Sequence, residues 1–125
     1  MKHRVSMVLV GLVVVLTGCS TTKYYWGSYE TALYKHYKNP GDREYLGQQL
    51  AGVIERGERR DRVPPGIYAE YGYVLLVHGK AKEAIVYFEQ EKRNWPESTH
   101  LMNIMIENAR AEQEKKLPAE TNDKK

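Results

Sequence analysis

Apolar residues recur with a helical period along most of the chain, and short Pro- and Gly-containing breaks divide the pattern into segments. The breaks lie at 39–41 (Asn-Pro-Gly), 63–66 (Val-Pro-Pro-Gly), 79–80 (Gly-Lys) and 95–96 (Trp-Pro). They separate five predicted helices, at about 28–38, 43–60, 67–78, 81–93 and 97–113. No stretch alternates between apolar and polar residues as a half-buried strand would. The sequence therefore predicts an all-α fold of antiparallel helical hairpins.

The first twenty residues follow a different pattern, which is typical of an export signal. A basic start with Lys2 and Arg4 precedes an apolar run at 5–16, in which Ser6 is the only polar residue. As a helix this run would span about 18 Å, which is short of the bilayer core of roughly 30 Å. A basic start, a short apolar run and small residues before a cut site predict a secretory signal peptide.

The segment at 16–19, Leu-Thr-Gly-Cys, resembles the lipobox of bacterial lipoproteins. This resemblance implies a thioether-linked diacylglycerol and an N-acyl chain on Cys19, with cleavage between Gly18 and Cys19. Ser20 stands where lipoproteins retained in the inner membrane usually carry Asp, so we expect an anchor in the outer membrane, on its periplasmic face. Lipidation would consume the only Cys of the chain and leave no free thiol or disulfide. A plain signal peptide followed by a chance Cys, or a buried apolar hairpin, is the alternative.

These features divide the chain into four parts. We expect a signal peptide at 1–18, a lipidated tether at 19–26, a helical domain at 27–113 and a disordered, charged tail at 114–125. The tether ends in Tyr24, Tyr25 and Trp26, whose rings could rest among lipid headgroups or pack on the first helices. We favour packing on the helices.

Residues 65–98 have the length of one tetratricopeptide repeat and resemble it in their order of large and small residues. Two antiparallel helices approach closely only where small residues lie at their crossing, here Gly72 and Ala84. The positions expected to carry the packing are Tyr68, Tyr71, Gly72, Ala84, Phe88 and Pro96. Glu91 departs from the pattern, because the repeat usually has a small residue there, and we expect looser packing at that point or the end of the stack. A single repeat cannot bury its own faces, so helices on both sides must cover it.

Three longer segments are similar to an uncharacterised family of small bacterial lipoproteins. They are Tyr-Tyr-Trp-Gly-Ser-Tyr-Glu at 24–30, Leu-Tyr-Lys-His-Tyr-Lys-Asn-Pro-Gly at 33–41 and Val-Pro-Pro-Gly-Ile-Tyr-Ala-Glu-Tyr-Gly-Tyr at 63–73. Members of that family are often encoded beside two other lipoproteins, one of them like the CsgG curli secretion pore. The resemblance covers about 20–100 and implies an accessory of an outer-membrane assembly. It supplies no activity and no catalytic residues.

Charge and residue spacing argue against several functions. A formal net charge of +3 is too small and too scattered for a nucleic-acid surface. His36, His78 and His100 fall on three different predicted helices, without the spacing of metal ligands. The sequence also has no phosphate-binding loop and no nucleophile elbow. We therefore expect a protein that is not an enzyme and has no metal or other cofactor beyond the lipid on Cys19.

Binding is the function that remains. The first helix of a tetratricopeptide repeat lines its concave face, and the match places Ala69, Tyr73, Leu76 and Val77 there. An exposed apolar patch usually marks an interface, although helices of the same chain can also cover it. The leading hypothesis is a lipid-anchored adaptor that binds or stabilises other envelope proteins, such as a CsgG-like complex. The alternative is a lipoprotein that binds peptidoglycan or a small ligand, with Tyr and Trp stacked on sugars.

Overall fold

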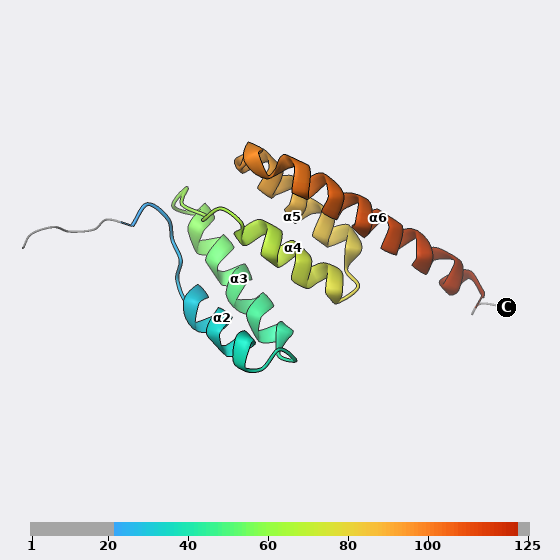
Figure 1. Ribbon diagram of the computed structural model, residues 1–125, viewed down its shortest axis with the longest axis horizontal. Helices are drawn as coiled ribbons and strands as arrows, with labels where there is room; N and C mark the ends of the chain where they lie inside the picture. The colour runs from blue at the N-terminus through green and yellow to red at the C-terminus, as the bar shows by residue number, and fades with distance from the viewer. Residues whose placement is uncertain (1–21, 123–125) are drawn as a thin grey trace, which may run out of the picture.

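The computed structural model describes residues 22–122 and contains five α-helices, one short 3-10 helix and no strand within that range. The elements are α2 (Tyr29–Lys38), α3 (Arg43–Glu58), α4 (Ile67–Val77), α5 (Ala81–Asn94), η1 (Pro96–Ser98) and α6 (Thr99–Asn122). Successive helices lie side by side in chain order, and α6 extends beyond the end of α5 (Figure 1). The prediction of an all-α fold is confirmed.

The Pro and Gly breaks of the sequence lie at the helix ends, and local capping explains two of these ends. Asp42 caps α3, because its Oδ1 accepts a hydrogen bond from the Tyr45 backbone N–H at 3.2 Å. The turn between α4 and α5 depends on Gly79, which has a φ of 77°. Around it, the N–H groups of Gly79 and Lys80 bond to the carbonyl groups of Leu76 and Leu75, a Schellman motif.

The last helix is longer than the sequence pattern predicts. α6 continues to Asn122, so the expected disordered tail is wrong for residues 114–122, whereas 123–125 lie outside the described residues. The residues after Ala109 are mainly Ala, Glu, Gln, Arg and Lys, which are strong helix formers, and there is no Pro between Ala109 and Pro118. Lys115 also pairs with Glu112 at 3.0 Å, one turn earlier. The polar residues here belong to a helix and do not mark the absence of one.

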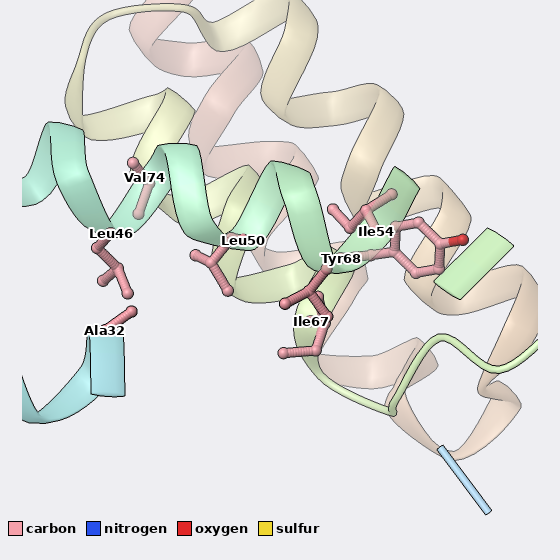
Figure 2. Close-up of a cluster of buried hydrophobic side chains, with 8 residues drawn as sticks. Ala32, Leu46, Leu50, Ile54, Ile67, Tyr68 and Val74 are labelled. Atoms are coloured by element: carbon pink, nitrogen blue, oxygen red, sulfur yellow. The ribbon is translucent and has the colours of Figure 1, made fainter. Parts of the chain in front are cut away.

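The hydrophobic core consists of two clusters that meet at α4. The first cluster joins α2, α3 and α4 (Figure 2) and contains Ala32, Leu46, Leu50, Val53, Ile54, Ile67, Tyr68 and Val74. The second cluster joins α4, α5 and α6 and contains Leu75, Ala81, Ala84, Phe88, Met102, Ile106 and Ala109. Tyr71 and Tyr87 pack against both clusters, and their rings meet edge to face with centroids 4.6 Å apart. The domain is thus two helical layers that share α4.

α4 and α5 approach each other closely at Gly72. A Cβ built on Gly72 would stand 2.7 Å from Cε1 of Phe88 and 3.2 Å from the carbonyl oxygen of Ala84. Both Phe88 and Ala84 are fully buried. Any side chain at position 72 would therefore force the two helices apart. Pro96 lies apart from this crossing, exposed at the start of η1.

The aromatic end of the predicted tether packs on the domain. The Tyr25 backbone N–H donates to the Arg62 carbonyl oxygen at 2.8 Å, and the Arg60 guanidinium lies 4.8 Å from the centre of the Tyr25 ring. The Tyr24 ring meets the Trp95 ring edge to face, with centroids 5.7 Å apart. The chain from Tyr24 onward therefore belongs to the folded domain and links its N-terminal end to the loop after α3.

Candidate functional site

The proposed lipid-attachment site, Cys19 with Gly18 before it, lies outside the described residues, which begin at Thr22. None of the helices within the described range is long and apolar enough to cross a bilayer.

The predicted binding face of α4 divides into an exposed half and a packed half. Tyr73 and Val77, one turn apart, are 51% and 42% exposed. Ala69 and Leu76 are partly buried and pack against the second cluster. Only Tyr73 and Val77 are therefore well placed to contact another molecule, because the other two residues already contribute to the core of this domain.

A pocket of about 370 Å³ lies beside the N-terminal segment, and four separate stretches of chain line it. Tyr24 comes from that segment and Tyr68 from α4, and Trp95 directly follows the end of α5. The loop after α3 supplies the fourth stretch and brings charged side chains. The pocket thus combines an aromatic wall with charged groups from elements that are distant in the sequence.

The charges around this pocket are balanced. Lys23 and Arg62 contribute two positive groups, and Glu58 and Asp61 contribute two negative ones. The Tyr68 hydroxyl donates to Oε1 of Glu58 at 3.0 Å, and burial together with this bond raises the pKa of Tyr68 well above its ordinary value. Tyr68 therefore remains neutral at any physiological pH and holds the Glu58 carboxylate at the pocket wall.

The loop that carries Asp61 has an unusual backbone. Asp61 has a φ of 53°, in the left-handed region, and is the one residue other than Gly within the described range with a positive φ. The next N–H, that of Arg62, bonds to the carbonyl oxygen of Gly57 at 2.9 Å. Asp and Asn tolerate this conformation better than other residues, since their short side chains bond locally. The loop thus fixes Asp61 in one position beside the pocket.

Glu91, which departs from the repeat pattern, is buried and caps α4. Its side chain is 2% exposed, and Oε1 accepts a hydrogen bond from the Gly66 N–H at 2.7 Å. Burial raises the pKa of Glu91, although the backbone N–H groups of Gly66, Ala69 and Tyr68 partly offset the rise. The packing at this position is therefore filled by a carboxylate rather than loose, and α6 follows without an end to the stack.

Sequence reasoning missed both the Glu91 cap and the pocket. One signal pointed to the cap: α4 begins after Pro-Pro-Gly, and no Ser, Thr, Asp or Asn precedes it to bond its first N–H groups. Glu91, an acidic residue at a position where the repeat usually has a small one, can accept hydrogen bonds from these N–H groups. The pocket had no comparable signal, because its residues come together only through the packing of the N-terminal segment.

Metal-ligand residue types are scattered through the described part of the chain. Within it, no group of three or more His, Cys, Asp or Glu residues is placed to hold a metal ion. Nδ1 of His78 lies 2.7 Å from the carbonyl oxygen of Val74, a local contact at the end of α4. Surface features of these described residues include an exposed apolar pair on α4 and a polar, aromatic pocket.

A family model, described as Domain of unknown function (DUF4810), matches residues 23–105, which is more than half of the chain. The chain therefore belongs to this family, and the prediction of membership in an uncharacterised family is confirmed. The match includes the three segments at 24–30, 33–41 and 63–73 that indicated it. Comparison with curated proteins gave no match, and comparison with solved structures gave none.

Proposed function

We propose that this protein is an adaptor, anchored to the outer membrane through lipid on Cys19, whose tetratricopeptide-like domain holds other envelope proteins on the periplasmic side. The observation that carries the proposal is the exposure of Tyr73 and Val77 on the first helix of the repeat-like hairpin. Neighbouring apolar side chains that together form an exposed patch often mark a protein interface, and Tyr is enriched in interfaces. The other faces of α4 pack into the two core clusters and hold Tyr73 and Val77 in place.

The packing of α4 on α5 supports the tetratricopeptide-like part of the proposal. Gly72 lies against Phe88 and Ala84, where such a repeat needs small and bulky residues to interlock. Helices also flank the hairpin on both sides, α3 upstream and α6 downstream, as a single repeat requires. Because the chain resembles a family often encoded beside other lipoproteins, we propose that its partner is a lipoprotein of the same assembly, such as a CsgG-like secretion pore.

Native co-purification tests the adaptor function. The full chain, tagged at its C-terminus, is recovered from membranes in mild detergent, and the neighbouring lipoproteins are quantified by mass spectrometry. We expect the double variant Tyr73→Ala, Val77→Ala to lose the neighbouring lipoprotein while its unfolding curve stays the same. Val86→Ala is the matched control, because Val86 is also an exposed apolar residue but lies on α5. Equal recovery by the double variant, or recovery of the adaptor alone by the native chain, would overturn the proposal.

Labelling with a fatty-acid analogue tests the anchor separately. We expect the native chain to incorporate the label and to fractionate with the outer membrane, and Cys19→Ser to do neither. Labelling of the Cys19→Ser variant, or a native chain that stays unlabelled, would contradict the anchor without bearing on the adaptor surface.

Binding of peptidoglycan or a small ligand is a second candidate function. The specific observation in its favour is the pocket lined by Tyr24, Tyr68 and Trp95. Aromatic side chains combined with a few polar groups are typical of ligand sites.

A further inference from the structure

We infer that the pocket between the N-terminal segment, the loop after α3 and the end of α5 binds a neutral saccharide. This inference deepens the second candidate function and is independent of the adaptor surface on α4. Three observations support it: the aromatic wall, the balanced charges, and a buried indole N–H that has no acceptor among the residues described.

The aromatic wall suits the apolar face of a sugar ring. Tyr24, Tyr68 and Trp95 all line the pocket, and the Tyr24 and Trp95 rings already contact each other with centroids 5.7 Å apart. The C–H groups on one face of a pyranose form a flat apolar surface that packs on such rings, and Tyr and Trp leave a polar tip for hydrogen bonding. Because the wall is assembled before a ligand arrives, little conformational freedom is lost on binding.

The charged groups favour a ligand with many hydroxyls and no net charge. Glu58 and Asp61 are hydrogen-bond acceptors, whereas Lys23 and Arg62 are donors, and the four charges cancel. A phosphate or nucleotide would gain from the two cations but would be repelled by the two carboxylates. A saccharide hydroxyl both donates and accepts, so it can use groups of either sign.

One donor near the pocket has no hydrogen-bond partner within the described range. Nε1 of Trp95 is buried and has no hydrogen-bond acceptor among the residues that the structure describes. Buried polar groups in proteins are nearly always paired, so an unpaired one needs an explanation. Trp95 itself lines the pocket, so a sugar bound there lies beside the residue that carries this unpaired donor.

The size of the pocket limits the ligand. A volume of about 370 Å³ lies near the small end of the range for ligand sites, which is about 300–1,000 Å³. Such a volume suits a unit the size of a mono- or disaccharide, free or at the end of a larger glycan.

Calorimetric titration of the full chain with N,N′-diacetylchitobiose tests the inference. A polyoxyethylene detergent is needed, because maltoside detergents carry a sugar of their own. We expect saturable binding with a Kd on the order of 1 mM or tighter, weakened about tenfold or more by Trp95→Ala. Asp61→Asn should weaken binding similarly, and it should not disturb the fold, because Asn adopts a positive φ readily.

Two controls make the titration specific. Trp26→Phe removes the other Trp, which contacts Tyr29 and does not line the pocket, and it should leave the affinity unchanged. It also leaves Trp95 as the only Trp, so that fluorescence reports on the pocket alone. The double variant Tyr73→Ala, Val77→Ala should bind the sugar normally, which separates failure of this inference from failure of the adaptor proposal.

Absence of binding at about 10 mM sugar would overturn the inference, as would equal affinity in the native chain and the two pocket variants. Displacement of the sugar by inorganic phosphate at a similar concentration would also overturn it, because it would indicate an anion site. If the sugar binds, purified sacculi and vesicles containing a glycolipid then distinguish the two sources of a saccharide, the cell wall and the membrane.

Discussion

The carboxylate of Glu91 accepts a hydrogen bond from the backbone N–H of Gly66 at 2.7 Å, and 25 positions in the sequence separate the two residues. This bond ties the last turns of α5 to the first turn of α4. It also places a carboxylate where the helix dipole favours negative charge. Gly66 has no side chain with which to cap α4, so Glu91 performs from a neighbouring helix what Asp42 performs locally for α3.

Removal of the Glu91 side chain should destabilise the domain. We expect Glu91→Ala to lower the free energy of unfolding by about 1–3 kcal/mol, because the Gly66 N–H loses its buried partner. Glu91→Gln keeps an acceptor oxygen of the same shape and should be at least as stable as the native chain at pH 7. Urea denaturation measures both. Equal stability of the Ala variant and the native chain would show that the hydrogen bond contributes nothing.

The difference in stability between the native chain and Glu91→Gln should depend on pH, with a definite sign. Burial raises the pKa of Glu91 in the folded state above its ordinary value of 4.5, so folding favours the protonated form. This contribution to stability is fully present below about pH 4.5 and is lost as the pH rises through the folded pKa. The stability of the native chain relative to Glu91→Gln should therefore fall as the pH rises through this window. A rise instead would mean that the N–H groups of α4 outweigh the effect of burial.

Substitution of Gly72 by Ala should be costly although Ala is the better helix former. The added Cβ would stand 2.7 Å from Cε1 of Phe88, so we expect a loss of about 1–3 kcal/mol from overpacking. Gly52→Ala is the matched control: its Cβ would meet only Arg56, at 3.8 Å, and should stabilise α3 by about 0.5–1 kcal/mol. Thermal or chemical unfolding of the two variants decides the matter, and shifts in the same direction would contradict the close crossing.

Alkaline pH should destabilise the domain through Tyr29. Burial, together with the nearby Glu70 carboxylate, raises the pKa of Tyr29 from 10.0 to about 12. Its contribution to stability is therefore present below pH 10 and lost as the pH rises toward 12. Tyr29→Phe should lose less stability than the native chain over this interval, and Tyr37→Phe, an exposed residue of the same helix, controls for the loss of one hydroxyl. Parallel curves for the native chain and Tyr29→Phe would refute the assignment.

Two neighbouring residues of α4 should respond differently to truncation. Leu76 packs against the second cluster, so we expect Leu76→Ala to cost about 1–3 kcal/mol. Val77 is 42% exposed, and Val77→Ala should change stability by no more than about 0.5 kcal/mol. Urea midpoints of the two variants measure the difference. If neither variant changed the stability, Leu76 would not contribute to the core and would again be a candidate for the binding surface.

The sequence predicted the elements whose causes are local. Pro and Gly at 39–41, 63–66 and 79–80 end helices through backbone conformation alone, and every helix boundary except the end of α6 agrees with the prediction to within two residues. Gly72 and Ala84 indicated the helix crossing correctly, because two helices can approach closely only where the side chains between them are small. Residues 114–122 were mispredicted, since polarity was taken as a sign of disorder although the residue types favour a helix.

The features that sequence reasoning missed depend on contacts between distant segments. The burial of Ala69 and Leu76 depends on how the second cluster packs along α4, which spacing along one helix does not specify. The pocket depends on the bond between Tyr25 and Arg62, which brings the N-terminal segment to the loop after α3. Such relationships are set by tertiary packing, and no single-helix pattern contains them.

The division of the core into two clusters determines how the domain opens. Local unfolding in such a nearest-neighbour array begins at the ends, because α2 and α6 each contact one layer only. α4 belongs to both layers, so its amide protons should exchange with solvent only when the whole domain unfolds. We therefore expect Tyr73 and Val77 to lie on the helix with the slowest exchange, and that helix would present the same rigid surface to any binding partner.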